Sequence, residues 1–353
     1  MAYQSINNVE IKGIAVAVPK QKKIVKDYPL FTPKEAENFT SVTGVEYSHL
    51  APKGITCSDL CQAAAERLLT DSKTDRGNID LIAFVSVSRD FYICPNTSNI
   101  LQAKLGLPEE CMAIDIPMAC SGYIHGLAVI SSLLQNGSIK RALLLVGETP
   151  SANQSFNDKT QWPLHGDAGS ATLLEYNSGL NRSMQFHLCS DGNGAEAIIC
   201  REMGVRHPSN ANTFSMRRMK DGIEREAWQS TMDGMSVFSF AISKPYKCIK
   251  GLSDKYDIDL ASIDYLLIHQ ANKMIDEKLR KKLKLTPEQV PYSMATFGNT
   301  SSCTIPVTMV SQIREQLSSK ENELVMCAFG SGLSWGAAHI YTNKIFCPKV
   351  IEI

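Results

Sequence analysis

Ile79-Asp80-Leu81-Ile82 in the first half of the chain has a counterpart in the second half, Ile263-Asp264-Tyr265-Leu266. Each of these apolar stretches leads into a second matching pair, Lys104-Leu105-Gly106-Leu107-Pro108-Glu109 and Lys282-Leu283-Lys284-Leu285-Thr286-Pro287-Glu288. One match alone can arise by chance. Two in the same order and at similar spacing indicate that the chain contains one structural unit twice.

Two further landmarks extend the repeat. After the matched stretches, each half has a strand that turns into a helix, and this turn carries Cys120 in the first half and Asn299 in the second. An apolar strand then follows in both halves, at residues 142–147 and 324–330. We therefore predict two copies of one α/β unit, with a shared site where equivalent strand ends meet.

The repeat also predicts the domain organisation. Residues 1–178 form the first half and residues 179–353 the second, with the boundary in Tyr176-Asn177-Ser178-Gly179. Residues 201–231 match neither copy and are polar, with several Arg and Met residues. We predict a mobile surface insertion here. A cap over an active site and a partner-docking loop are the alternatives.

Apolar periodicity predicts strands alternating with helices. Strands are expected near residues 11–18, 79–87, 111–118 and 141–147, and helices near 58–70, 97–106 and 121–136. Strands that are almost continuously apolar, placed between amphipathic helices, are typical of a sheet covered on both faces. The fold class is therefore α/β.

Length and composition exclude several classes of protein. The 353 residues suit about two domains of roughly 150 residues each. Lys+Arg and Asp+Glu both number 36, so no net charge attracts nucleic acid or an anionic membrane. No apolar run approaches the roughly 18 residues of a transmembrane helix. The N-terminus lacks the pattern of a signal peptide, so we expect a cytoplasmic protein.

The 11 cysteines do not form a recognisable framework. Their number is odd, no CxxC pair occurs, and Cys57 and Cys61 fit one face of a helix. Without a secretion signal, we expect reduced thiols and neither a disulfide framework nor a metal site.

Cys120 is the candidate nucleophile. It lies in Asp115-Ile116-Pro117-Met118-Ala119-Cys120-Ser121-Gly122-Tyr123, where an apolar strand ends and an apolar helix begins. Free backbone N–H groups and the helix dipole at such a position favour a thiolate, so we predict a lowered pKa for this thiol. A buried structural cysteine is the alternative. His125, in the same helix, is predicted to be a packed side chain.

Two polar residues of the second half are candidates for the same site. His269 begins His269-Gln270-Ala271-Asn272, directly after an apolar strand, and ligands of α/β sheets gather at the carboxyl ends of strands. It is a candidate acid, base or hydrogen-bond donor, or else a structural histidine. Asn299 opens a helix, where an N-cap role is the alternative. Its equivalence to Cys120 favours a functional role.

A glycine-rich turn completes the set of candidates. Phe329-Gly330-Ser331-Gly332-Leu333-Ser334-Trp335-Gly336 joins two apolar strands. Such a turn brings backbone N–H groups close to a ligand oxygen, as an oxyanion hole requires. No P-loop lysine is present, so a phosphate cradle is not expected. His165-Gly166-Asp167-Ala168-Gly169-Ser170 is a second glycine turn, which we interpret as structural.

The chain resembles β-ketoacyl-acyl-carrier-protein synthase III, a family of the thiolase superfamily. The resemblance rests on four motifs taken together: Ala-Cys-Ser-Gly, His-Gln-Ala-Asn, Gly-Asn-Thr-Ser and Gly-x-Gly-x-x-Trp-Gly. Weaker matches extend the resemblance along the whole chain: Thr43-Gly44-Val45, Gly166-Asp167-Ala168-Gly169, and Met232, Gly234, Val237 and Phe238. The joint Cys, His and Asn pattern is specific, whereas the glycine pieces alone are weak.

The resemblance implies a thiolase fold, a duplicated five-layered αβαβα sandwich, and a homodimer. It implies that Cys120 takes an acyl group from acyl-CoA or from acyl carrier protein (ACP). His269 and Asn299 would bind the thioester carbonyl of malonyl-ACP as CO₂ leaves, and the carbanion would attack the acyl-cysteine. The backbone N–H groups of Cys120 and Ser331 would form an oxyanion hole. No metal or organic cofactor is implied.

The chain departs from the family pattern at several positions. The family usually has glycine where Ser331 stands, so a Cβ there alters the oxyanion turn or narrows the acyl pocket. Many members clamp coenzyme A with Trp and Arg where this chain has Asn38 and Val42, and with Arg where it has Lys159. Lys159 is therefore the candidate contact to coenzyme A or phosphopantetheine. An ACP donor or an unusual acyl-CoA becomes more plausible. The family usually has an apolar segment before the Gly-Asp turn, and this chain has Trp162-Pro163-Leu164-His165 there.

Alternative functions remain open. Decarboxylative condensation, in fatty-acid initiation or in a specialised pathway, is the first hypothesis. Transfer of the acyl group from Cys120 to an alcohol or amine without decarboxylation is the second, although such variants often change the His or Asn. A non-catalytic partner subunit would lack the cysteine. A hydroxymethylglutaryl-CoA synthase would need a glutamate where residues 79–95 offer only Asp80 and Asp90.

Overall fold

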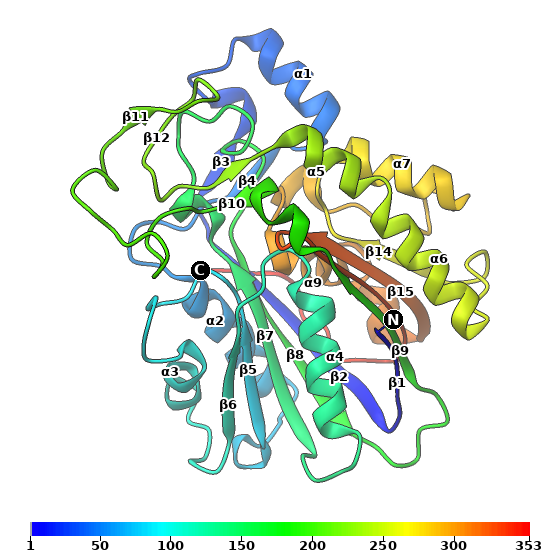
Figure 1. Cartoon of the computed structure of the whole chain (residues 1–353). Coiled ribbons are helices and arrows are strands. Elements are labelled where there is room, and N and C mark those ends of the chain that lie inside the picture. The colour runs from blue at the N-terminus through cyan, green and yellow to red at the C-terminus, as the bar shows by residue number, and fades with distance from the viewer. Residues whose placement is uncertain (1) are drawn as a thin grey trace.

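The computed structural model describes residues 2–353, which form two large β-sheets with helices outside and between them (Figure 1). The strand order in the first sheet is β17 (Ile351–Glu352), β2 (Val9–Val18), β8 (Ala168–Tyr176), β7 (Arg141–Glu148), β5 (Leu81–Val85) and β6 (Met112–Ile116). The strand order in the second is β1 (Ala2–Ile6), β9 (Met184–Ser190), β16 (Ser334–Asn343), β15 (Glu321–Gly330) and β14 (Tyr265–Ile268). In each sheet a parallel pair (β5–β7, β14–β15) joins an antiparallel one (β7–β8, β15–β16). The shared pattern confirms the predicted duplication. The strand predicted before Asn299 is wrong, because the short helix α8 (Met294–Phe297) lies there and the second sheet has no counterpart of β6.

Helices complete five layers. The outer face of the first sheet is covered by α2 (Cys57–Asp71) and α3 (Thr97–Lys104), and α4 (Gly122–Leu134) and α9 (Thr304–Gln312) lie between the sheets. The outer face of the second sheet is covered by α5 (Gly234–Ala241), α6 (Lys244–Tyr256) and α7 (Lys273–Leu283). This order of layers is the predicted αβαβα sandwich. None of the helices in residues 2–353 combines the length and the apolar character needed to cross a membrane.

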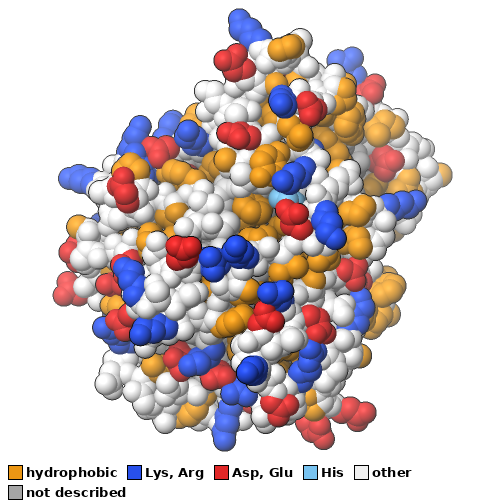
Figure 2. Space-filling view, turned by 180° about the vertical axis from the view of Figure 1, so that it is seen from behind, with side chains coloured by type: hydrophobic (Ala, Val, Ile, Leu, Met, Phe, Trp, Pro, Cys, Tyr) orange, Lys and Arg blue, Asp and Glu red, His pale blue; other side chains and the backbone are white. Residues whose placement is uncertain are grey.

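Burial on both faces explains the apolar strands. Every residue of β5 is buried, because α2 and α3 cover one face of the first sheet and α4 covers the other. Helix α2 begins within one residue of the start of the helix predicted near residues 58–70. Thr56 and Asp59 fix this start, because they form a reciprocal capping box at the N-terminus. Around this core, basic and acidic side chains alternate over the face shown in Figure 2, in line with the balanced charge.

The first and last strands of the chain each pair with the sheet formed mainly by the other half. β1 pairs antiparallel with β9, so residues 2–6 complete the second sheet, whereas β17 pairs parallel with β2 in the first. The repeat in the sequence does not include these short strands. The division into residues 1–178 and 179–353 therefore stays a prediction. At each end of the chain, a short strand belongs to the sheet formed mainly by the other half.

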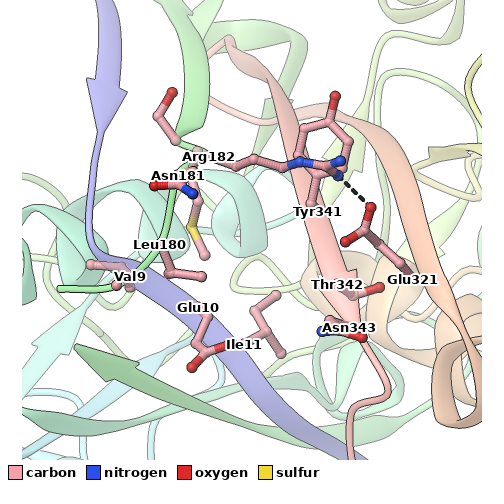
Figure 3. A pocket seen from close by; sticks show the side chains of 13 residues that line it. Val9, Glu10, Ile11, Leu180, Asn181, Arg182, Glu321, Tyr341, Thr342 and Asn343 are labelled. Atoms are coloured by element: carbon pink, nitrogen blue, oxygen red, sulfur yellow. Dashed lines mark hydrogen bonds and ion pairs between the residues drawn. The ribbon is translucent and has the colours of Figure 1, made fainter. Parts of the chain in front are cut away.

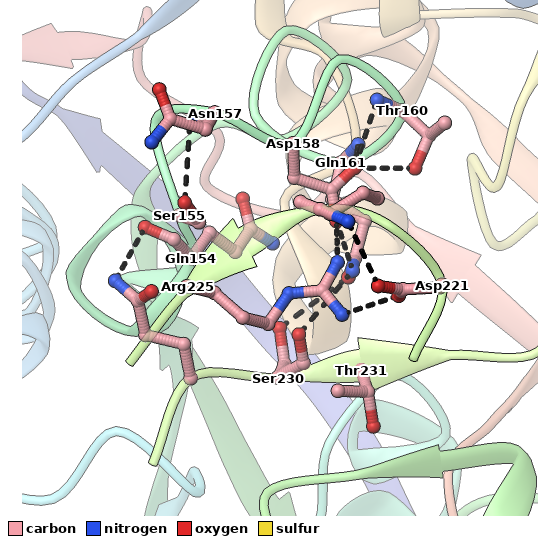
Figure 4. A network of polar contacts seen from close by, with 12 residues as sticks. Gln154, Ser155, Asn157, Asp158, Thr160, Gln161, Asp221, Arg225, Ser230 and Thr231 are labelled. Carbon is pink, nitrogen blue, oxygen red and sulfur yellow. Dashed lines mark hydrogen bonds and ion pairs between the residues drawn. The ribbon is translucent and has the colours of Figure 1, made fainter. Parts of the chain in front are cut away.

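The insertion at residues 201–231 is anchored to the first half. Most of it is exposed, but Arg225 is only 1% exposed and its guanidinium lies 2.8 Å from the Asp158 carboxylate (Figure 4). Gln161 donates a hydrogen bond to the same carboxylate, and Ser155 donates to the backbone oxygen of Glu224. These contacts fix the insertion to residues 154–161, the segment that leads to His165.

Candidate active site

Cys120 lies in a strand–turn–helix segment, as predicted. β6 ends at Ile116, and Cys120 immediately precedes Ser121, the N-cap of α4. Glycine at position 122 lets this helix start close to β5, because a Cβ there would lie 2.8 Å from a methyl group of Val85. The thiol therefore follows the carboxyl end of β6, in the segment that packs against β5.

The second half of the chain supplies the surroundings of the thiol. The Sγ atom of Cys120 lies 3.4 Å from the hydroxyl oxygen of Ser301, a residue held at a φ of 53°. Gly330, at the end of β15, packs directly against Cys120: a Cβ on Gly330 would lie 2.5 Å from the Cβ of Cys120. As a residue Cys120 is partly exposed, and its surroundings come from both halves of the chain.

The prediction of a lowered pKa for Cys120 is wrong. Burial raises the pKa of this thiol to about 11, and the nearby negative charge of Glu148 acts in the same direction. The hydrogen bond from Ser301 opposes the shift but does not reverse it. The cost of placing a charge on a thiol enclosed by the protein outweighs the stabilising effect of the helix N-terminus on which the sequence argument rested.

His269 follows the last residue of β14 and is almost fully buried. Its Nδ1 lies 2.7 Å from the hydroxyl oxygen of Thr304. Burial lowers the pKa of His269 to about 3, and the neighbouring ring of His165 acts in the same direction, whereas a hydrogen bond with the Ser301 backbone opposes the shift. The imidazole is therefore neutral near pH 7.

Asn299 is oriented by the turn that follows it. Its side-chain Oδ1 accepts a hydrogen bond of 2.9 Å from the backbone N–H of Ser301, which leaves the Nδ2 hydrogens as donors for another group. Its backbone is held by the first half, since Asn299 N–H donates to Leu164 and Gly166 N–H donates to Asn299. The N-cap alternative is not observed, because Asn299 does not cap α9.

Ser301 links the three predicted residues. Its hydroxyl contacts Cys120, its N–H orients Asn299, and its backbone oxygen lies 3.1 Å from the Thr304 hydroxyl that contacts His269. The structure therefore brings Cys120, His269 and Asn299 around one short turn. The sequence analysis singled out this turn but assigned no role to Ser301. The contacts of Ser301 depend on its positive φ of 53°, which no sequence motif predicts.

Ser331 lies in the glycine turn beside the thiol. Its hydroxyl donates to the backbone oxygen of Ile198, at 3.2 Å, so the side chain is directed towards the insertion-bearing segment. Ser334 donates to the backbone oxygen of Ser331 and also contacts Ser121. The extra Cβ at Ser331 is thus accommodated by its own hydrogen bond, and the role of its N–H stays a prediction.

Lys159 lies apart from this group, at the surface. Its Nζ is 2.9 Å from a carboxylate oxygen of Glu35 in α1 (Pro33–Thr43), the helix that also carries Asn38 and Val42. The three departures from the family pattern therefore belong to one surface region. No contact between Lys159 and Cys120, His269 or Asn299 occurs among the described residues.

His165 and Lys23 are neighbours of the site that the sequence did not single out as functional. The Nδ1 of His165 lies 2.9 Å from the Gln161 backbone oxygen, and burial lowers the pKa of this histidine to about 4. Lys23 donates to the backbone oxygens of His165 and Trp162, and burial lowers the pKa of its amine to about 8. Together they hold the segment that pairs with Asn299.

The cavity in Figure 3 is separate from this site. It has a volume of about 200 Å³ and lies between β2, β16 and the segment at residues 179–184, where Arg182 pairs with Glu321. Cys120, His269 and Asn299 do not line it. A second cavity, of about 340 Å³, is lined by Ser88, whose backbone N–H donates to Glu148, and by Trp228 of the insertion.

Replacing Gly330 with alanine should lower the rate of acylation of Cys120 about 100-fold. The added Cβ would have to displace the side chain of Cys120, whose Cβ would lie 2.5 Å away, and a displacement of about 1 Å has this effect on a positioned nucleophile. Gly204→Ala is the matched control, because open space surrounds that position. Intact-mass measurement of acyl loading over time checks both variants. Equal loading rates in the two would contradict the proposed contact.

Alkylation of Cys120 should become about 100-fold faster between pH 7 and pH 9. The thiolate is the reactive form, and with a pKa of about 11 its population rises about tenfold per pH unit over this range. Iodoacetamide labelling, followed by peptide mass spectrometry to separate Cys120 from the other cysteines, gives the rate. A plateau above pH 7 would show instead that the thiol has the low pKa expected from the helix N-terminus.

Comparisons with known proteins identify the family to which the chain is similar. The family model of 3-oxoacyl-[acyl-carrier-protein] synthase III matches residues 114–192, and the model of its C-terminal part matches residues 254–342. The β-ketoacyl-ACP synthase III of Streptococcus sanguinis is 30% identical over 334 residues, covering 94% of this chain and 98% of that protein. That of Caldanaerobacter subterraneus is 30% identical over 309 residues, covering 87% and 90%.

Solved structures give the same result. A 3-oxoacyl-(acyl-carrier protein) synthase from Burkholderia xenovorans LB400 superposes with a TM-score of 0.93 and 30% identity, covering 100% of this chain and 99% of that one. OleA from Xanthomonas campestris superposes with a TM-score of 0.77 over 96% of this chain. At 18% identity, the second likeness concerns the fold alone.

Proposed function

The chain belongs to the β-ketoacyl-acyl-carrier-protein synthase III family, an acyl-transferring group of condensing enzymes, and we propose that its reaction runs through Cys120, His269 and Asn299. The observation that carries this proposal is the turn at Ser301, which contacts or orients all three side chains. In the first half-reaction, the Cys120 sulfur attacks the carbonyl carbon of an acyl thioester. The carrier thiolate leaves with a proton, and the acyl group stays on the sulfur.

In the second half-reaction, the two donors act on the thioester oxygen of malonyl-ACP. Loss of CO₂ leaves an electron pair on the α-carbon and negative charge on that oxygen, which Asn299 Nδ2 and His269 Nε2 stabilise. The histidine donates from Nε2 only in the tautomer in which Nδ1 accepts, so the Thr304 hydroxyl has to turn its hydrogen from the Ser301 backbone oxygen, to which it donates in this structure, towards Nδ1. The carbanion then attacks the acyl carbon, and the bond to Cys120 breaks. Retention of both donors favours condensation over plain acyl transfer.

We propose ACP as a partner and a homodimer as the assembly. β6 is the edge strand of the first sheet, so its outer backbone groups are unpaired in the single chain. Phe91, Tyr92 and Ile93, between β5 and α3, are all exposed apolar side chains. A second copy of the chain, paired along β6, would cover both features. Light scattering should give twice the 38.9 kDa of the monomer. The cytoplasm remains the expected location.

A panel of donors tests the proposed reaction. The protein is mixed with acyl-CoA and acyl-ACP thioesters of increasing chain length, and acylation of Cys120 is followed by intact mass. Malonyl-ACP is then added, and the β-ketoacyl product is identified. We expect loading by at least one donor and a product one acetate unit longer. Loading without any condensation would favour the non-decarboxylating alternative, and loading at another residue would contradict the assignment of Cys120.

Glu35→Gln should lower the KM for the donor about threefold if Lys159 contacts the phosphates of the carrier. The substitution removes the carboxylate that now pairs with Lys159 and leaves its charge free, a surface effect expected to be small and to weaken with salt. Steady-state kinetics at low and high salt measure it, with Lys159→Ala expected to raise the KM. If neither variant changes the KM, the proposed contact is wrong.

A further inference from the structure

Three side chains able to bind a metal lie together outside the active site. His187 and Cys189 are two residues apart on β9, so they project from the same face of the second sheet, towards Cys248 on α6. One ligand atom from each, an imidazole nitrogen and two sulfurs, lie within 4.8 Å of one another. We call His187, Cys189 and Cys248 the thiol–imidazole cluster.

Hydrogen bonding gives His187 the form that binds a cation. Its Nδ1 lies 3.1 Å from the backbone oxygen of Cys248, which can only accept, so Nδ1 carries the hydrogen. The Nε2 lone pair then faces the sulfur of Cys189, at 3.3 Å. Histidines that bind metals are held in this way, with the second ring nitrogen donating to a carbonyl.

Packing holds the ring in this orientation. Tyr3 of β1 stacks on the imidazole of His187 with a centroid distance of 4.1 Å. Gly251 of α6 leaves the necessary space, because a Cβ there would lie 2.8 Å from the Tyr3 hydroxyl and 3.1 Å from the His187 ring. The ligand atoms therefore come from a strand and a helix whose separation is fixed.

The two sulfurs differ in their surroundings. The thiol of Cys248 donates a hydrogen bond of 3.3 Å to the backbone oxygen of His187. Cys248 is almost completely buried and Cys189 is partly exposed, so one side of the cluster is open to solvent.

We propose that the thiol–imidazole cluster binds one Zn²⁺ ion, with a water molecule as the fourth ligand on the exposed side of Cys189. Two sulfurs and one imidazole suit Zn²⁺, whereas Mg²⁺ and Ca²⁺ prefer oxygen ligands. Binding releases the two thiol protons, and the two thiolates neutralise the charge of the ion. The site would join β9 to α6 and add stability to the second sheet. It is independent of the reaction at Cys120.

Zinc titration of the metal-free, fully reduced protein tests the proposal, in competition with a chromogenic chelator. We expect one Zn²⁺ per chain, with affinity lowered on the order of 100-fold or more in Cys189→Ser and in His187→Gln. The controls are Cys94→Ser and Cys200→Ser, which remove exposed cysteines outside the cluster, and Cys120→Ala, which removes the nucleophile. All three should bind zinc like the unmodified protein.

A second measurement does not depend on how the variants fold. In the unmodified protein, Zn²⁺ should protect Cys189 from iodoacetamide, and Co²⁺ should give a thiolate-to-cobalt charge-transfer band. Zinc binding that is unaffected by Cys189→Ser, together with unprotected Cys189, would overturn the proposal. So would uptake of Cu⁺ but not Zn²⁺, or the formation of a Cys189–Cys248 disulfide with hydrogen peroxide in a protein that takes up no zinc.

Discussion

Cys120→Ala should lose acyl loading and condensation by about 10⁴-fold or more, because the covalent intermediate can no longer form. The substitution removes one sulfur from a turn in which Gly330 and Ser301 contact the same side chain, so the fold should be kept. Intact-mass spectrometry after mixing with the donor panel measures the loss. Cys200→Ser, at an exposed position, is the control and should load normally.

One outcome would remove the basis of the proposed reaction. If the Cys120→Ala protein still gains the acyl mass, another of the 11 cysteines carries the group, and peptide mapping would identify it. If it loads nothing but still gives a β-ketoacyl product, then condensation does not pass through an enzyme-bound thioester.

His269→Ala and Asn299→Asp should each slow malonyl decarboxylation about 10²–10³-fold, the usual effect of removing one donor to a developing oxyanion. Acyl loading of Cys120 should continue in both, because loading uses neither side-chain donor. Asn299→Asp is the more specific test of the donor role. It keeps the shape of Asn299 and its contact with Ser301, but it replaces the Nδ2 donor with oxygen. Release of labelled CO₂ and intact-mass loading are measured in parallel.

The pH dependence separates this step from loading. The pKa of His269 is about 3, so the neutral ring should keep the rate of decarboxylation constant between pH 5 and pH 8. Asn193→Asp changes an exposed amide and is the matched control. Parallel loss of loading and CO₂ release in His269→Ala and Asn299→Asp would indicate a structural role, and unchanged CO₂ release would exclude them as donors.

The repeated units could be predicted from sequence because their determinants are local. A strand buried on both faces is apolar throughout, so the runs near 79–87 and 141–147 point directly to β5 and β7. The turn at Cys120 follows from small and polar residues placed after such a strand, whereas Asn299 follows the short helix α8 and not the predicted strand. The site residues could be predicted for the same reason: equivalent strand ends of two copies meet in space.

Other features depend on contacts between distant residues. The raised pKa of Cys120 reflects burial by Gly330 and its neighbours, which the strand–helix pattern around residue 120 cannot show. Arg225 looks like a surface residue of a polar segment until Asp158 is placed beside it. His187 and Cys248 are 61 residues apart and lie on different kinds of element, so no spacing rule connects them.

The exchange of end strands has a consequence for how such a protein can evolve. Each half of the duplicated chain supplies an edge to the sheet of the other, through β1 on β9 and β17 on β2. A recombination event near residue 178 that replaced one half with that of a distant relative would leave each sheet bordered by a foreign strand. The two copies are therefore expected to be inherited as one indivisible unit and to melt in a single cooperative transition.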